Sequence, residues 1–234
     1  MRIWRAAGVF VLLLFSCPAL ADSLVAAKGA ASGDEVALED GRLLRLRNIK
    51  AAAPEAKAFL ESAVSGRDLI LQDETEDRFG RVTASVFVKE TRDSVEALLL
   101  REGLAFVYPV WDDEPLDDLC EVEREARTEK RGFWSTHEDV PSEQAATLNG
   151  KLGFITGSVS KAERIKNKVY LYMGERNPPD LTIVIAARYL RPLKKRGVEP
   201  FSLIGKQVRV RGWVTDVGGP TMTVADVHQI ELVE

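Results

Sequence analysis

The sequence predicts a mainly β protein with some helix, an α+β arrangement divided into two units. Short runs in which apolar and polar residues alternate, such as Val82–Val88, have the pattern of half-buried strands. Three runs between residues 54 and 130 carry apolar residues at helical spacing instead. Charge divides the chain, because residues 22–136 hold 16 Lys and Arg against 25 Asp and Glu, whereas residues 137–234 hold 14 against 11.

Length and composition bound the class of protein. The chain has 234 residues, 45% of them hydrophobic, and a formal net charge of -4, so it is neither a basic nucleic-acid coat nor an acidic disordered tail. Its length allows one large domain or two small ones. Two histidines and two cysteines exclude a closed Cys/His zinc site of the usual spacing and a disulfide framework.

Residues Met1–Ala21 have the features of a secretory signal. Two arginines precede the apolar run Ala6–Phe15, which is too short to span a bilayer, and Ala19-Leu20-Ala21 is a small-x-small cleavage site. We therefore expect a periplasmic or secreted protein that begins at Asp22 and has no transmembrane helix. Cys17 leaves a lipoprotein signal as the alternative.

The first unit, residues 22–136, alternates strands with helices. Asp40-Gly41 between two alternating runs indicates a hairpin, and Pro54 and Gly66 fit the start and end of a helix. Asp93 with Glu96 three residues later indicates the cap of a second helix. The strands expected are 36–38, 44–46, 68–72 and 82–88, and the helices are 54–66, 93–103 and 116–130. Cys120 is expected to be a buried thiol of the last helix.

An ordered series of motifs in this unit resembles the staphylococcal nuclease (thermonuclease-like) family. The series is Ser32-Gly33-Asp34-Glu35-Val36, Arg45-Leu46-Arg47-Asn48-Ile49, Asp77-Arg78-Phe79-Gly80-Arg81, the run Val95–Ala105, and Glu125-Ala126-Arg127 through Gly132-Phe133-Trp134-Ser135. The resemblance covers the whole unit. It implies a five-stranded Greek-key barrel of the OB type that carries three helices.

The resemblance also implies candidate site residues. Family members that cut nucleic acid hold calcium with carboxylates, clamp the phosphate between two arginines and activate water with a glutamate. Arg45 and Arg81 match the two arginines, and Asp34 matches a metal-binding aspartate. Glu55, in Pro54-Glu55, is the candidate for the glutamate base that the family motif offers, although this dipeptide better matches the start of the first helix.

One departure from the family pattern predicts that hydrolysis is lost. Lys50 stands where the family has a further ligand aspartate, so an ammonium replaces an oxygen donor. We expect no cofactor, an ion pair between Lys50 and Asp34, and a binding or scaffold protein of the cell envelope. The alternative is a calcium-dependent nuclease of DNA or RNA, weakened or using Glu35 or Glu55.

The second unit is expected after a polar linker at residues 137–150. Five alternating segments (154–159, 169–173, 181–185, 208–214 and 221–224) and a helix at 187–195 resemble a second, smaller OB-like barrel over residues 151–234.

Anionic ligands, single-stranded nucleic acid among them, are the partners that the basic and aromatic residues indicate. The candidate binding residues are Arg78 in the first unit and Lys194, Lys195 and Arg196 in the second. Tyr170, Tyr172 and Trp213 could supply stacking surfaces. The alternative is that these tyrosines only pack and that the basic run is a solvated loop, and the oligomeric state stays open.

Overall fold

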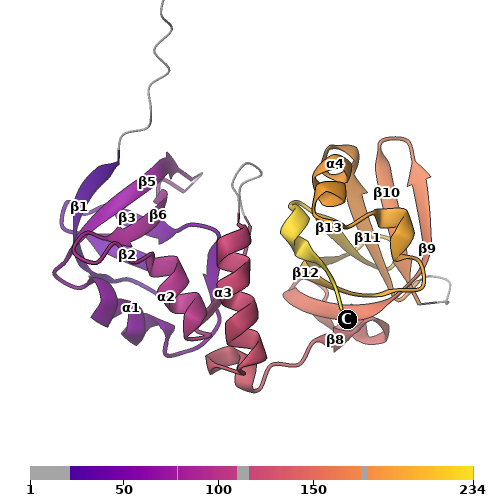
Figure 1. The fold of residues 1–234 in the computed structure, drawn as a ribbon, viewed down its shortest axis with the longest axis horizontal. Coiled ribbons are helices and arrows are strands. Elements are labelled where there is room, and N and C mark those ends of the chain that lie inside the picture. The colour runs from indigo at the N-terminus through magenta and orange to yellow at the C-terminus, as the bar shows by residue number, and fades with distance from the viewer. Residues whose placement is uncertain (1–21, 78, 110–115, 175–178, 234) are drawn as a thin grey trace, which may run out of the picture.

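The computed structural model describes residues 22–77, 79–109, 116–174 and 179–233, and it folds into two barrels with helix α3 between them (Figure 1). The expected signal segment, its alternative Cys17, and Arg78 lie outside the described residues. In the described part, no helix is long and apolar enough to cross a membrane.

The first barrel closes in the order β1-β2-β3-β6-β5, with β5 paired back to β1. Its neighbouring strands are antiparallel except β3 and β6, which are parallel. This order confirms the OB-type barrel. Its strands are β1 (Ser23–Ala30), β2 (Glu35–Leu38), β3 (Leu43–Leu46), β5 (Asp68–Glu76) and β6 (Val82–Val88). Strand β1 was not predicted, because its sequence SLVAAKGA contains little apolar alternation.

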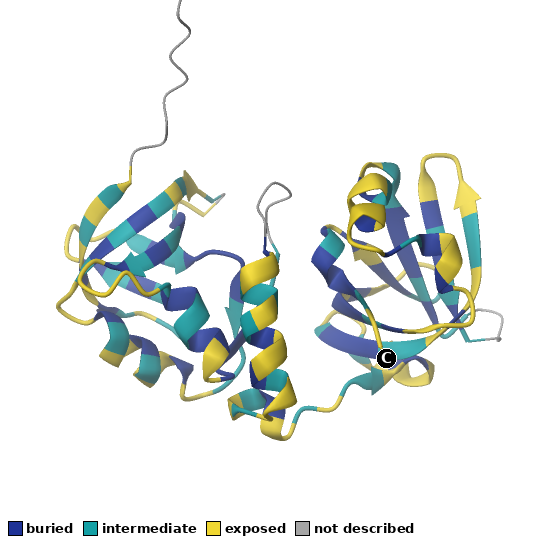
Figure 2. Cartoon of the chain, in the orientation of Figure 1, coloured by how far each residue is buried: buried dark blue, intermediate teal, exposed yellow. Residues whose placement is uncertain are grey.

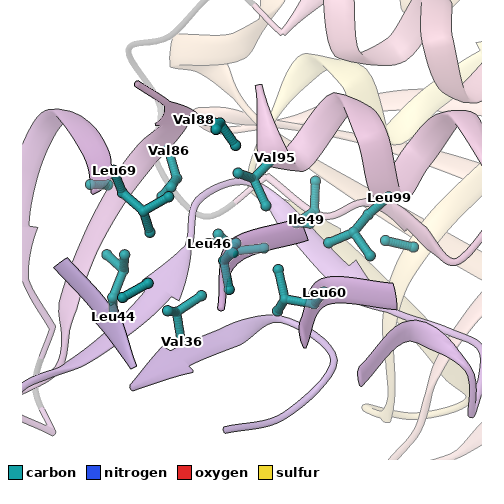
Figure 3. Packing of buried hydrophobic residues seen from close by; sticks show 14 of the residues in the cluster. Val36, Leu44, Leu46, Ile49, Leu60, Leu69, Val86, Val88, Val95 and Leu99 are labelled. Atoms are coloured by element: carbon teal, nitrogen blue, oxygen red, sulfur yellow. The ribbon is translucent and has the colours of Figure 1, made fainter. Parts of the chain in front are cut away.

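Three helices cover this barrel: α1 (Ala56–Val64), α2 (Val95–Arg101) and α3 (Asp117–Thr128). Leu60 of α1 and Leu99 of α2 point toward Leu46 of the barrel, and all three side chains are fully buried (Figure 3). Burying a side chain of this size contributes about 1.5–3 kcal/mol, so the shared core fixes the helices on the barrel.

The cap of α2 differs from the sequence expectation. Ser94 is the N-cap, and its hydroxyl accepts a hydrogen bond from the backbone N–H of Ala97. Glu96 turns inward, is 2% exposed and accepts a hydrogen bond from the Val86 N–H of β6 at 3.0 Å. Desolvation raises the pKa of Glu96 to about 7. The expected capping glutamate is thus a buried bridge between helix and barrel.

The second barrel repeats the strand order of the first. Its strands follow the order β12-β13-β11-β10-β9, closed by pairing of β12 with β9, and its one parallel pair is β11 with β13. The fold class predicted for the chain is therefore confirmed. The strands are β9 (Leu152–Ile165), β10 (Lys168–Met173), β11 (Leu181–Ala186), β12 (Gln207–Asp216) and β13 (Pro220–Val224).

Short elements complete both units. Helix α4 (Ala187–Lys195) follows β11, as the sequence predicted. Strand β14 (Ile230–Leu232) pairs with β12, and β4 (Ile49–Ala51) pairs with β7 (Ala105–Val107) in a small sheet of the first unit. The 3-10 helices are η1 (Gly132–Ser135), η2 (Ser142–Leu148), η3 (Pro200–Leu203) and η4 (Val227–Gln229).

The segment expected to be a linker is folded onto the second barrel. Strand β8 (Val140–Pro141) pairs with β9, and Ala145 of η2 is fully buried in the second core. The polar composition gave no sign of these contacts, because Val140, Ala145 and Leu148 are the few apolar residues by which the segment packs against the barrel. The domain boundaries at 136/137 and 150/151 stay predictions.

Buried contacts join the two barrels. Phe106 of β7 and Trp134 of η1 pack against Phe154 of β9, with ring centroids 5.1 and 5.5 Å from it. The buried guanidinium of Arg211, on β12, donates to Glu123 of α3 at 2.7 Å and to the Val107 carbonyl at 3.1 Å. Figure 2 shows buried residues on α3 and on the strands of both barrels.

Candidate functional site

The strand register brings three charged candidates from the sequence, Glu35, Arg45 and Arg81, together on the outer face of the first barrel. Glu35 of β2 lies opposite Arg45 of β3, and Arg45 lies opposite Thr83 of β6. Arg81 immediately precedes β6. Because the neighbours Val36, Leu44 and Val82 are buried, alternation places the charged side chains outward.

Two carboxylates hold Arg81. Its guanidinium contacts Glu35 at 2.5 Å and Asp77 at 2.6 Å, and both carboxylates are less than 20% exposed. The hydrogen bond to Asp77 is the main cause that raises the pKa of Arg81. Desolvation opposes the shift at Asp77, but the hydrogen bonds from Arg81 outweigh it and lower the pKa of Asp77. The guanidinium is therefore neutralised by the chain itself.

Arg45 differs from Arg81 in its surroundings. In the described ranges, its side chain has no ion pair within 4.0 Å, although Glu35 faces it across the β2–β3 pair. It is half-buried. The two arginines thus share one face. Glu35 lies opposite Arg45 in the strand register but pairs with Arg81 and not with Arg45.

Asp34 forms hydrogen bonds and not the expected ion pair. Its carboxylate accepts from the Ser32 hydroxyl at 3.0 Å and from the Ala51 N–H at 3.4 Å. Lys50, next to Ala51 on β4, forms no ion pair among the described residues, so the expected pairing with Asp34 is wrong. The nearby hydroxyl and amide satisfy the aspartate without the long lysine side chain, which is only half-buried and remains partly solvated.

Glu55 lies away from the arginines. It is exposed at the residue before α1 and lines a pocket of about 490 Å³. Ala52, Ala53, Leu104 and Phe133 also line this pocket, whereas Asp34, Arg45 and Arg81 do not. The structure therefore does not bring Glu55 to the phosphate-clamp position.

The donors around Asp34 are few for calcium, which takes six to eight oxygen ligands. In the described part of the chain, no group of three or more Asp, Glu, His or Cys side chains is placed to hold a metal. Glu35 is already bound to Arg81, and Lys50 adds a positive charge to this end of the barrel. The residues present do not fit a calcium ion.

The role of Asp77 was missed by sequence reasoning. Asp77 accepts backbone hydrogen bonds from Phe79 at 2.8 Å and Arg81 at 3.1 Å, as well as contacting the Arg81 side chain. The signal was available, since Asp followed by Gly80-Arg81 is typical of a turn in which the aspartate bonds its own backbone.

The basic run of the second unit does not act as one surface. Arg196 contacts Asp117 of α3 and the His228 ring, so it belongs to the contact between the barrels. Lys194 lies 3.9 Å from Glu199. Lys195 is exposed at the end of α4.

The three aromatic candidates lie at two different places on the second barrel. Trp213 of β12 donates its indole N–H to the Tyr108 hydroxyl at 2.8 Å, which links the barrels. Tyr170 and Tyr172 stack side by side on β10, with centroids 6.5 Å apart. Cys120, expected to be buried, is intermediate in exposure, and desolvation raises its thiol pKa to about 12, so it is a poor nucleophile.

Known proteins match the first barrel and its flanking helices. The model of the staphylococcal nuclease homologue family matches residues 39–136. An Escherichia coli protein named as an uncharacterized endonuclease is 31% identical over 141 residues, which are 56% of this chain and 90% of that protein. A Shigella flexneri micrococcal nuclease is 27% identical over 147 residues, covering 56% of this chain and 84% of its own.

A plant protein gives a third match. A probable staphylococcal-like nuclease of rice, CAN1, is 32% identical over 111 residues, which are 45% of this chain and 32% of the plant protein. The region matched by the family model holds strands β3, β5 and β6 of the barrel, its three helices and the outer-face arginines Arg45 and Arg81. On this combined evidence, the chain belongs to the staphylococcal nuclease homologue family.

Proposed function

We propose that this member of the family is an exported binding or scaffold protein of the cell envelope whose nuclease site does not cleave phosphodiesters. The observation that carries the proposal is the double ion pair of Arg81 with Glu35 and Asp77. A phosphate needs unpaired cations to offset its charge while a nucleophile approaches. Here a ligand phosphate competes with two carboxylates that are already in place.

The second support is the position of Lys50. By resemblance it replaces a ligand carboxylate, which changes the local charge by two units and disfavours a divalent cation. Asp34, the remaining candidate ligand, is hydrogen-bonded to Ser32 and Ala51. Glu55 lies in a pocket that the clamp residues do not line, so the glutamate that the resemblance offers as base does not stand beside Arg45 and Arg81.

Calcium calorimetry tests the loss of the metal site. The wild-type protein should show no heat of calcium binding at millimolar concentration, whereas Lys50→Asp should bind calcium weakly. Lys57→Asp, an exposed lysine at the start of α1, is the control for an equal charge change elsewhere. Tight calcium binding by the wild type would contradict the proposal.

The alternative function is a calcium-dependent nuclease. The names of the Escherichia coli and Shigella relatives favour it, since both describe nucleases. Glu35 is then the residue that must supply the base, because it lies beside Arg81 and opposite Arg45.

Export is supported by the N-terminal pattern of the sequence. The mass of the protein recovered from the envelope fraction should correspond to a chain that starts at Asp22. A lipid-modified N-terminus at Cys17 would instead assign the protein to a membrane anchor.

A further inference from the structure

The outer face of β10 presents two parallel aromatic rings. Val169, Leu171 and Met173 are buried, so Tyr170 and Tyr172 point outward, where both are half-exposed. Their planes differ by 15° and their centroids lie 6.5 Å apart. The ammonium of Lys161, from β9, lies 5.8 Å from the Tyr172 ring, and the Tyr172 hydroxyl is 3.2 Å from Glu163.

Basic residues frame these rings. The hairpin between β9 and β10 carries Lys166 and Lys168, both exposed, and the Ala187 N–H at the start of α4 donates to the Asn167 carbonyl at 2.8 Å. Figure 1 shows this hairpin beside α4. The segments 161–174 and 180–195 together hold eight Lys or Arg against two Asp or Glu, in a chain whose net charge is -4.

Helix α4 continues the basic surface. Arg191 and Lys195 are four residues apart, so they lie on one side of the helix, away from the buried Leu193, whereas the Arg188 guanidinium donates to the Tyr189 hydroxyl at 2.8 Å. Arg191 and Lys195 are exposed and form no ion pair in the part of the chain that the structure describes. Their charge is therefore available to a ligand.

Contacts between the barrels leave this face open. The first unit contacts β9 through Phe154 and β12 through Arg211 and Trp213, and Asp117 contacts Arg196, the residue after α4, so Arg196 is not counted in this face. The contact on β9 is at Phe154, near the start of that strand, whereas β10 pairs with its later part, from Val159 to Ile165. Figure 1 places β10 on the side turned away from the first barrel.

We propose that this face, formed by Tyr170, Tyr172, the β9–β10 hairpin and α4, binds single-stranded nucleic acid. Each ring offers a plane on which an unpaired base can stack, and the surrounding cations offset the phosphates. Charge complementarity selects a polyanion, because this surface opposes the net charge of the rest of the chain. The tyrosines lie among Glu163, Thr182 and Lys161, a polar setting that suits bases and sugars better than lipid tails.

This inference rests on the proposed binding function and specifies single-stranded nucleic acid as the ligand. The surface includes no residue of the first-barrel site. Fluorescence anisotropy with a labelled oligothymidylate of about 20 nucleotides tests it on the full mature chain. Tyr170→Ala and Tyr172→Ala should each weaken binding about five- to 100-fold, whereas Tyr170→Phe and Tyr172→Phe should bind as the wild type does.

Charge-reversal variants test the same surface without truncating the tyrosines, so the test does not depend on the folding of the alanine variants. Lys168→Glu with Arg191→Glu should weaken binding at least tenfold and lower the slope of log affinity against log salt by at least about 1. Lys151→Glu with Lys206→Glu makes the same charge change at exposed positions outside the surface and should have a much smaller effect.

Three results would overturn this assignment. The first is no oligonucleotide binding at about 50 mM salt, the second is equal weakening by the two charge pairs, and the third is binding to vesicles of anionic phospholipid in place of the oligonucleotide. Cleavage of the oligonucleotide would contradict the proposal that the nuclease site is inactive, but not the proposed binding surface. Absence of both binding and cleavage would contradict the binding surface alone.

Discussion

Glu35 controls what Arg81 can bind at the outer face of the first barrel. It lies 2.5 Å from the guanidinium, which Asp77 also contacts. Removing its charge leaves Arg81 with one carboxylate and leaves Arg45 without an opposing anion across the strand pair. The side chain therefore acts as an internal competitor for any phosphate that approaches.

Glu35→Gln should consequently strengthen binding of a phosphorylated dinucleotide by several-fold in calorimetry, because one competing negative charge is lost. Glu39→Gln, in the exposed β2–β3 turn, is the matched control and should change nothing. Adding Arg81→Ala to Glu35→Gln should remove the gain. An unchanged affinity for Glu35→Gln would show that the ion pair does not limit binding.

Glu96 predicts a pH dependence of stability. Its pKa is about 7 in the folded protein against an ordinary value of 4.5, so the folded state binds more protons between these pH values. The contribution of Glu96 to stability is thus fully present below about pH 4.5 and is lost as pH rises to 7. Glu96→Gln should remove this dependence.

Urea unfolding at several pH values measures the effect. The free energy of unfolding of Glu96→Gln relative to wild type should rise by on the order of 3 kcal/mol between pH 4.5 and 7. The exposed Glu102→Gln serves as the control and should follow the wild-type profile. Parallel profiles for wild type and Glu96→Gln would show that Glu96 does not titrate in this range.

At the scale of elements, α3 and β12 are joined by a buried ion network. Arg211 contacts Glu123 of α3 and Glu231 of β14, and Arg127 contacts Glu231 at 3.0 Å. Desolvation of the buried guanidinium is outweighed by these carboxylates, which raise the pKa of Arg211. Glu123 also accepts from the Val107 N–H at 2.5 Å, so one carboxylate fixes both α3 and β7.

Arg211→Met should lower the free energy of unfolding by about 3–5 kcal/mol, because the buried Glu123 loses its hydrogen-bonded cation and keeps only Arg127, at 3.8 Å. Denaturant unfolding measures this loss. The double variant Arg211→Met with Glu123→Gln should recover part of it, since the buried negative charge is gone while the acceptor for Val107 remains. Arg164→Met, in the exposed hairpin, should lie within about 0.5 kcal/mol of wild type. A similar loss in the single and double variants would exclude the charge as its cause.

The strands could be predicted better than the contacts between them. Val82–Val88 shows its alternation plainly, and the motif order around Arg45 and Arg81 implied the barrel. Glu123 and Arg211 are 88 residues apart and carry no local signal of pairing. Glu96 was mistaken for a cap residue because its spacing from Asp93 is that of a capping box, whereas burial against Val86 decides its role.

At the scale of the whole molecule, the barrels should unfold together. The aromatic cluster of Phe106, Trp134 and Phe154 and the Arg211 network both cross between them. Separating the units would expose that cluster and remove the hydrogen bond from Arg211 to Glu123. The structure therefore predicts that neither barrel keeps its full stability alone.

Urea transitions followed by far-UV circular dichroism and by tryptophan fluorescence should coincide with one midpoint. Trp134 and Trp213 both lie at the contact and report its loss. Arg211→Met should move both transitions together to lower urea. Two separated transitions in the wild type would show that the barrels are independent.

The central claim is that the family site of this chain does not hydrolyse nucleic acid, and a cleavage assay tests it most directly. The mature wild-type protein should leave labelled single-stranded DNA and RNA intact with calcium, with magnesium and with chelator. Arg81→Ala, which removes the clamp residue, should give the same result as the wild type. Calcium-dependent cleavage by the wild type that Arg81→Ala abolishes would contradict the claim.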